Sequence, residues 1–176
     1  TGRRADQTPV EKLAIAHNLK VAYYPDFDHN LITKDTLGLC ASFDHLIPKE
    51  IIEKFGGNLY NLHPSLLPQY RNVSPVQYAI ALGDSETGIT LFRIAPTIDD
   101  REIVSQVAEP ILPTDTTPTL TSRLFTLGAE LFTQMLQGYE PCKPITNKVR
   151  NLVFTHRLTR DSGYIEWSVL QMLLAN

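Results

Sequence analysis

The pattern of apolar and polar positions along the chain predicts helices that alternate with strands. Short apolar runs bounded by turn residues predict strands at 21–24, 37–41, 59–63, 89–94 and 102–108. Capping and stop signals around apolar residues at helical spacing predict helices at 8–18, 48–55, 74–83 and 118–137. Because helices alternate with strands, we expect an α/β fold with a largely parallel sheet.

Three of these segments carry an expectation about burial. Apolar residues recur along one side of the last and longest helix. They predict a stripe that packs against the core rather than a cofactor site. Its residues are Leu120, Leu124, Leu127, Leu131 and Met135. In the first helix, Val10, Leu13 and Ala14 are expected on the buried side. The continuous apolar run at 37–41 is typical of a strand that is covered on both faces.

The chain after the longest helix has a different character. Two prolines beyond Gly138 predict a linker at 139–150, and the apolar segment at 167–174 predicts a final helix. We therefore divide the chain into a main domain, residues 1–138, and a second part, residues 139–176, that holds the linker and the start of a C-terminal region.

The composition is that of an ordinary globular domain. The chain has 176 residues, of which 43% are hydrophobic and 20% charged, so it can bury a sizeable core. The formal net charge of -3 argues against binding to nucleic acid by charge alone. Cys40 and Cys142 lie far apart without a CxxC spacing, which favours a reduced, intracellular protein without a metal site. No apolar run reaches the roughly 18 residues of a membrane helix.

Polar side chains end the strand at 59–63, where the sequence reads NLHPSLLP. Asn61 and His63 face one side of this strand and Leu62 the other, because side chains alternate along a strand. In open parallel sheets, ligands bind beyond the carboxyl ends of the strands. An amide and an imidazole can donate hydrogen bonds to a developing oxyanion, and an imidazole can also move a proton. The pair therefore suits acyl-group transfer, without a serine or cysteine nucleophile elbow.

Asp99, in the polar loop between the last two strands, is a candidate third member of this site. Its carboxylate can accept a hydrogen bond from His63 and support the charged form of the imidazole. The alternative interpretation is structural: Asn61 and His63 satisfy backbone groups at a strand end, and Asp99 is a turn residue. Sequence spacing by itself leaves both open. An acid–base dyad of Asp99 and Asp100 is less favoured, because adjacent residues rarely point together.

Several stretches of the chain resemble the folate-dependent formyltransferase family. The stretch NLHPSLLPQYRNVSPVQYAIALGDSETGITL is similar to the family's signature region, in which the string Asn-x-His-Pro-Ser-Leu-Leu-Pro is highly specific. ASFDHLIPKEII resembles the strand and loop before the signature, TIDDREIVSQ the later aspartate loop, and TGRRADQTPV the Gly-Arg loop near the N-terminal end. HRLTRDSGYIEW is similar to the segment that leads into the C-terminal domain of the members that formylate methionyl-tRNA, so the resemblance is closest to those members.

The resemblance implies a fold, a reaction and a set of site residues. It implies a Rossmann-like, doubly wound and mostly parallel sheet, and transfer of a formyl group from 10-formyltetrahydrofolate to the amino group of initiator methionyl-tRNA. Asn61, His63 and Asp99 match the family's catalytic residues, and no metal is expected. The residues at donor-binding positions are Phe43, Asp44, His45, Leu46, Ser65, Leu66, Leu67 and Pro68. The residues expected near the acceptor are Arg3, Tyr70 and Arg71.

Three residues stand where the family usually has glycine: Asp44, Asn72 and Arg101. Asn and Asp tolerate left-handed backbone, so Asn72 and Asp44 are compatible with such a turn, whereas Arg101 is the least easily accommodated. Two alternatives stay open, and the replaced glycines motivate the second. One is an enzyme that formylates another amine, such as glycinamide ribonucleotide or an amino-sugar nucleotide. The other is a formyltransferase-like binding module that has lost turnover.

The resemblance also sets expectations for the whole protein. The family begins with a strand and a helix before the Gly-Arg loop and ends with a separate barrel-like domain. Neither is found in this sequence, so we expect that Thr1 is not the natural start. The complete protein is expected to be a monomer that does not associate with membranes. Its expected location is the cytoplasm, or the mitochondrial matrix if the source is eukaryotic.

Overall fold

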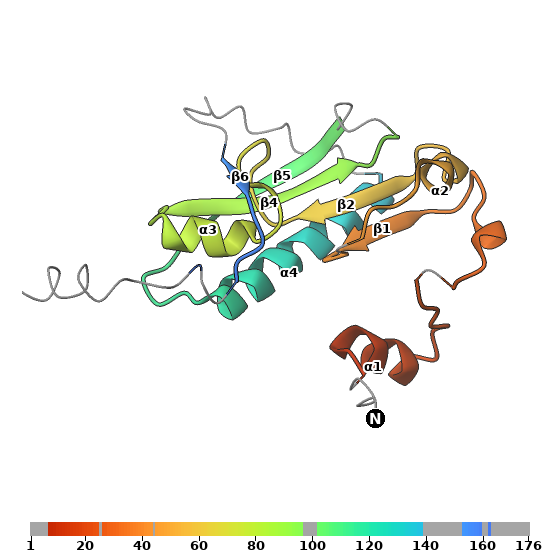
Figure 1. Ribbon diagram of the computed structural model, residues 1–176, viewed down its shortest axis with the longest axis horizontal. Helices are drawn as coiled ribbons and strands as arrows, with labels where there is room; N and C mark the ends of the chain where they lie inside the picture. Colours follow the sequence, from red (N-terminus) through yellow and green to blue (C-terminus); the bar gives the residue numbers. More distant parts are fainter. Residues whose placement is uncertain are drawn as a thin grey trace, which may run out of the picture.

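A four-stranded sheet forms the centre of the computed structural model, which describes residues 7–24, 26–43, 45–96, 102–138, 153–159 and 162. The strands lie in the order β1-β2-β4-β5 (Figure 1). Their bounds are Gly38–Ala41 for β1, Leu59–His63 for β2, Glu86–Arg93 for β4 and Glu102–Pro110 for β5. The helices are α1 (Pro9–Ala16), α2 (Lys49–Lys54), α3 (Pro75–Ala81) and α4 (Thr117–Leu136), with a short 3-10 helix at His29–Leu31.

The α/β class is confirmed, and the sheet is mixed rather than mostly parallel. The β1–β2 pair is parallel, whereas the β2–β4 and β4–β5 pairs are antiparallel. Residues 94–101 join β4 to β5 and are fewer than the dozen or so that a parallel crossover requires. His63, the last residue of β2, pairs with Thr90, the first residue of β4 that pairs with β2, so the chain re-enters the sheet near the end where β2 finishes.

One face of the sheet packs against α3 and α4 and forms the hydrophobic core. Leu120 and Leu124 of α4 are fully buried in one cluster with Leu62 and Ile89 from the strands. All five residues of the predicted stripe belong to this cluster or pack against it, so that prediction is confirmed. Gly128 permits the close approach of α4, because a Cβ atom there would lie 2.7 Å from Ile89 Cδ1 and 3.1 Å from the methyl groups of Leu62.

The N-terminal part of the chain differs most from the expectations. Helix α1 begins after Thr8, whose Oγ1 accepts a hydrogen bond from the Glu11 amide at 3.2 Å. No residue of α1 is buried, and Val10, expected on the buried side with Leu13, is 77% exposed. Residues 21–24 form no strand. In Figure 1, α1 lies apart from the sheet, so its apolar side has no sheet to pack against.

Strand β1 forms one edge of the four-stranded sheet. Among the described residues it pairs with β2 alone. Leu39 in this strand is 40% exposed, and Leu37 just before it is also exposed. The expectation of a strand covered on both faces is therefore wrong here. A continuous apolar run predicted the strand correctly, but it did not predict that the strand lies at an edge.

A second, two-stranded sheet joins parts of the chain that are distant in sequence. Strand β3 (Arg71–Asn72) pairs in parallel with β6 (Phe154–Thr155). This pairing brings the C-terminal segment beside the loop that follows β2. The linker predicted at 139–150 and the helix predicted at 167–174 fall outside the described residues. None of the described helices combines the length and the apolar character needed to cross a membrane.

Candidate active site

Strand β2 directs Asn61 and His63 to the face of the sheet opposite α4. Leu62, between them, lies in the core under α4. Asn61 pairs with Phe92 of β4, and His63 pairs with Thr90. Residues that oppose each other in an antiparallel pair share a face of the sheet, so the four side chains project from the same side. The shared face of Asn61 and His63 that strand spacing predicted is confirmed.

Two hollows meet at Asn61. The larger hollow has a volume of about 360 Å³, and its lining includes Phe43, His45, Phe92 and Asn61. The smaller hollow has a volume of about 220 Å³, and its lining includes Phe43, Asn61, His63, Asn72 and Ser74. Phe43 and Asn61 thus line both hollows. A side chain in that place can contact two molecules at once, one in each hollow.

His63 is held by a backbone group of the loop that follows it. Its Nε2 lies 2.8 Å from the carbonyl oxygen of Tyr70, and the residue is only 9% exposed. A carbonyl oxygen can only accept, so Nε2 carries a hydrogen and donates it to Tyr70. This bond fixes the tautomer of the neutral ring and leaves Nδ1 as the nitrogen whose protonation can change during a reaction.

A buried polar network holds the loop after β2. The Thr90 hydroxyl donates a hydrogen bond to the Ser65 carbonyl at 2.6 Å and accepts one from the Leu67 amide at 3.1 Å. Gln106 Nε2 donates to the Leu67 carbonyl and to Thr90 Oγ1, each at 2.9 Å. Ser65 and Thr90 are fully buried. These bonds attach the loop to β4 and β5 and so fix its position beside the end of β2.

Three residues with left-handed backbone follow this loop: Tyr70 with φ 54°, Asn72 with φ 82° and Ser74 with φ 63°. Asn72 occupies one of the positions where the resemblance predicted glycine, and its positive φ explains that preference. Ser74 stands at the N-cap position of α3 but makes no side-chain capping bond. Asn72 and Ser74 both line the smaller hollow, so the turns at these residues shape its wall.

A match to a family of known proteins identifies the family of this chain. A family model described as formyl transferase matches residues 2–136, which is most of the chain. The chain belongs to the formyl transferase family. The loop that Thr90 and Gln106 hold in place lies within the matched residues, and the smaller hollow lies where that loop begins at the end of β2.

Bacterial relatives of this formyl transferase chain are similar over almost its whole length. The methionyl-tRNA formyltransferase of Buchnera aphidicola subsp. Schizaphis graminum is 31% identical over 182 residues, which cover 98% of this chain and 58% of the relative. That of Streptococcus equi subsp. equi is 31% identical over 177 residues, with 95% and 57% covered. The chain therefore spans somewhat more than half the length of these relatives.

Solved structures of formyl transferases share the fold. The sugar 3N-formyl transferase WlaRD, determined in the presence of dTDP and 5-N-formyl-THF, has a TM-score of 0.65 and 26% identity, covering 83% of this chain and 52% of that one. The phosphoribosylglycinamide formyltransferase from Bacillus halodurans has a TM-score of 0.52 and 26% identity, covering 58% and 53%. The formyltransferase fold predicted from the resemblance is confirmed.

The residues predicted to bind the formyl donor fall into two groups in this formyl transferase chain. One group lines the larger hollow and consists of Phe43, His45 and Leu46. In the other group, Ser65 and Leu67 are buried in the network below the loop, and Pro68 is half-buried beside them. Leu66 packs against Gly88, where a Cβ atom would lie 2.4 Å from Leu66 Cδ2. The second group holds the loop in this structure.

Of the residues predicted near the acceptor, Tyr70 contacts the site through its backbone carbonyl, which accepts from His63. Tyr70 is 4% exposed, and its phenol donates a hydrogen bond to the Asp84 carboxylate. Burial, and then the bond to Asp84, raise the pKa of Tyr70 to about 12. The Arg71 carbonyl accepts a hydrogen bond from the Thr155 hydroxyl at 2.6 Å.

The remaining site residues lie outside the described residues, and their roles stay predictions: Arg3, Asp44, Asp99 and Arg101.

Sequence reasoning missed three residues that contribute to the site. Tyr24 lies against two side chains of the larger hollow, with its ring centroid 5.5 Å from that of Phe43 and 5.2 Å from that of His45. Its contacts depend on how the chain folds, and no local pattern indicates them. Thr90 and Gln106 did leave a signal, because each interrupts an apolar strand. A polar side chain inside a buried strand must find a hydrogen-bond partner.

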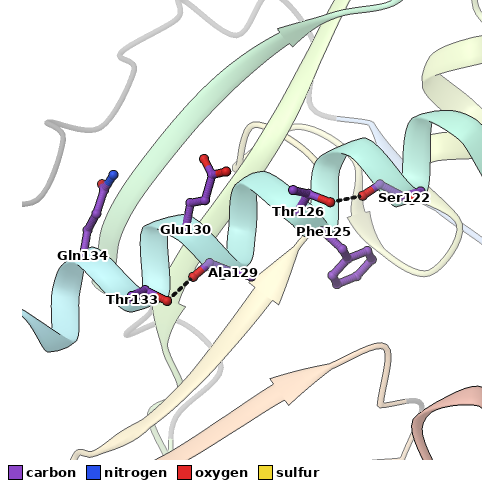
Figure 2. Close-up of a pocket in the computed structure, with 7 residues that line it drawn as sticks. All are labelled: Ser122, Phe125, Thr126, Ala129, Glu130, Thr133 and Gln134. Atoms are coloured by element: carbon purple, nitrogen blue, oxygen red, sulfur yellow. Dashed lines mark hydrogen bonds between the residues drawn. The ribbon is translucent and has the colours of Figure 1, made fainter. Parts of the chain in front are cut away.

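Other features of the described residues do not resemble the site at Asn61. A hollow of about 670 Å³ lies on the outer face of α4, and Figure 2 shows seven lining residues, all from this one helix. The Thr126 and Thr133 hydroxyls donate to the carbonyls of Ser122 and Ala129, at 3.0 and 2.8 Å, within the helix itself. They are therefore engaged by the helix rather than directed to a ligand. The described residues also contain no group of three or more His, Cys, Asp or Glu side chains that could hold a metal ion.

Proposed function

We propose that this chain is the catalytic part of an enzyme that transfers a formyl group from 10-formyltetrahydrofolate to the amino group of initiator methionyl-tRNA. One observation carries the proposal: Asn61, two residues before His63, lies where two hollows meet. A formyl donor in one hollow and an amine in the other would bring the formyl carbon to the boundary that Asn61 lines. Membership of the formyl transferase family and the likeness to methionyl-tRNA formyltransferases support this reaction.

We assign the larger hollow to the folate donor. Its volume of about 360 Å³ lies in the range of small-molecule pockets. The aromatic rings of Phe43 and Phe92 line it, and such rings suit a flat, conjugated ligand. We assign donor binding to residues 43–46 and to the loop at 65–68, whose side chains keep the loop against the sheet. No metal takes part in this assignment.

In the proposed mechanism, the amine nitrogen attacks the formyl carbon, and the carbonyl oxygen becomes an oxyanion. The Asn61 amide donates a hydrogen bond to this oxyanion, an interaction typically worth about 3 to 4 kcal/mol. His63 donates from a protonated Nδ1 while its Nε2 stays bonded to Tyr70. When the intermediate collapses, the bond from carbon to N10 of the folate breaks. The amine loses one proton and N10 gains one, and we assign this relay and the orientation of His63 to Asp99.

We assign the smaller hollow to the acceptor amine, with Arg3, Tyr70 and Arg71 on the acceptor side. Two observations favour methionyl-tRNA: the relatives that match 95% or more of the chain, and the segment HRLTRDSGYIEW near the C-terminal end. The second candidate is another amine, such as an amino-sugar nucleotide or glycinamide ribonucleotide. The likeness to WlaRD over 83% of the chain favours that alternative.

For the whole protein we propose the following organisation. Residues 1–138 form the catalytic domain, and residues 139–176 form a linker and the start of a C-terminal region. The complete protein acts as a monomer without membrane association, in the cytoplasm, or in the mitochondrial matrix if its source is eukaryotic.

The test is formylation by the intact protein with 10-formyltetrahydrofolate and a panel of acceptors: methionyl-tRNA, glycinamide ribonucleotide and an amino-sugar nucleotide. Formyl-methionyl-tRNA should be the preferred product, and Asn61→Ala should lower its formation strongly. Asn30→Ala, at an exposed position of the short 3-10 helix, is the matched control and should leave turnover unchanged. Preference for another amine would reject the proposed acceptor. Folate binding by calorimetry without turnover of any acceptor would reject the enzyme and favour the binding module.

A further inference from the structure

The backbone carbonyl that holds His63 belongs to a residue in an unfavourable conformation. Tyr70 has φ 54°, and left-handed backbone costs a non-glycine residue roughly 1 kcal/mol or more. Other interactions must therefore keep Tyr70 in place. Its side chain supplies them, because the residue is only 4% exposed and the phenol donates a hydrogen bond to Oδ2 of Asp84.

Asp84, which accepts the hydrogen bond from Tyr70, is itself held in place by a backbone contact. It lies in the turn between α3 and β4, and its amide donates to the Ala79 carbonyl at 3.1 Å. Ala79 is fully buried in α3, so the turn is attached to the core of the domain. The raised pKa of Tyr70, about 12, keeps the phenol protonated at any ordinary assay pH. The phenol therefore keeps the proton that it donates to Asp84.

We propose that Tyr70 and Asp84 are positioning residues that hold the imidazole of His63 in place for formyl transfer; this rests on the proposed function of His63. The contacts run from the Asp84 carboxylate to the Tyr70 phenol, and from the Tyr70 carbonyl to Nε2 of His63. The first contact fixes the side chain of Tyr70. The second fixes the imidazole ring of His63 relative to the Tyr70 backbone. A displacement of about 1 Å at a reacting group can lower a rate by about 100-fold.

Four variants of the intact protein test this role. Tyr70→Phe keeps the buried ring and removes the bond to Asp84, and kcat should fall about tenfold, with KM for the folate donor unchanged. Asp84→Ala should have the same effect. Asp84→Asn keeps an oxygen that can accept from the phenol, so it should retain most of kcat. Tyr23→Phe is the matched control: it removes a phenol–carboxylate bond to Glu11 on the exposed surface and should leave kcat unchanged.

The double variant Tyr70→Phe/Asp84→Ala adds a test of coupling. Because both changes break one contact, the double variant should lose about as much kcat as either single variant. If kcat in the double variant fell by the product of the two single-variant factors, the result would contradict a shared contact. Equal kcat in wild type and Tyr70→Phe, within twofold, would overturn the proposal.

A spectroscopic measurement separates this inference from the proposed function. Nitrogen-15 NMR of the histidine rings reports the tautomer and the exchange of the Nε2 proton of His63 without any need for turnover. In wild type the Nε2–H form should be present with a slowly exchanging proton, and Tyr70→Phe should speed that exchange. If no acceptor is formylated and this change is still seen, the proposed function fails and the positioning of the ring stands. An unchanged ring signal in Tyr70→Phe overturns the positioning role whatever the activity.

Discussion

The hydroxyl of Thr155 donates a hydrogen bond to the carbonyl oxygen of Arg71 at 2.6 Å, although 84 residues separate the two in the chain. Thr155 is fully buried and pairs with Asn72 between β3 and β6. Arg71 directly follows Tyr70, whose carbonyl binds His63. The C-terminal segment therefore supports the turn that forms the wall of the smaller hollow.

Replacement of Thr155 by valine should lower the free energy of unfolding by about 1 to 2 kcal/mol. Valine fills the same space but leaves the Arg71 carbonyl without its partner. Urea denaturation of the intact protein measures the loss. Thr133→Val is the matched control, because Thr133 also donates to a backbone carbonyl but on the exposed face of α4. That change should cost less than about 0.5 kcal/mol. Equal losses in the two variants would contradict the role of Thr155.

The two candidate oxyanion donors should behave differently when each is replaced by alanine. Asn61→Ala should lower kcat by about 100- to 1,000-fold with little change in stability, because Asn61 is only half-buried. His63→Ala should lower both kcat and stability, because it also leaves the Tyr70 carbonyl without its ring partner.

Single-turnover kinetics and urea denaturation of each variant separate the two effects. In the double variant the loss of kcat should be smaller than the product of the single losses, because both groups act on one oxyanion. A kcat for Asn61→Ala within twofold of wild type would mean that the mechanism proposed here is wrong.

The left-handed backbone of Asn72 makes a prediction about stability. Asn72→Ala should destabilise the protein by about 1 kcal/mol, since alanine tolerates a φ of 82° less well than asparagine. Asn72→Gly should be neutral or stabilising in the folded state, because glycine adopts this conformation without steric cost. Thermal unfolding of both variants checks the prediction, and a more stable alanine variant would contradict it.

The raised pKa of Tyr70 predicts how stability falls at high pH. In the folded protein this pKa is about 12, whereas the ordinary value is 10.0. The unfolded chain therefore loses its phenol proton first as the pH rises. The stabilisation from the protonated phenol is complete below pH 10 and is lost as the pH rises from about 10 towards 12.

Urea denaturation between pH 9 and 11.5 measures this loss. In Tyr70→Phe the fall should be shallower, because the phenol is absent. The same variant should be less stable than wild type at pH 9 and closer to it at pH 11.5. Parallel pH curves for the two proteins would contradict the assignment of this pKa to Tyr70.

Elements with a strong local pattern were predictable from the sequence. The strand predicted at 59–63 is β2, and the helix predicted at 118–137 is α4 with bounds that differ by one residue at each end. Local pattern does not indicate which element covers an apolar surface. The prediction that one side of α1 is buried was therefore wrong, because no residue of α1 is buried. An apolar run does not indicate the direction of its strand relative to its neighbours, so the antiparallel pairs of β4 did not follow from the apolar runs.

The candidate site was predictable where it depends on the two-residue period of a strand. That period places Asn61 and His63 on one face. The support of His63 by Tyr70 was not predictable, because it uses a backbone carbonyl, and every residue carries one. The contact of Thr155 with Arg71 depends on a fold that joins distant segments. Sequence reasoning therefore placed Asn61 and His63 on one face of β2 but did not indicate the groups that hold His63.

The position of Phe43 and Asn61 between the two hollows has a consequence for the order of events in catalysis. A molecule in either hollow contacts side chains that also border the other, so each reactant helps to form the binding surface of its partner. The two substrates should therefore bind cooperatively, each raising the affinity for the other by the same factor. Direct attack within this ternary complex gives sequential kinetics, in which double-reciprocal plots at several donor concentrations intersect. Parallel lines would instead indicate a formylated enzyme intermediate, which requires a nucleophile at the boundary between the hollows.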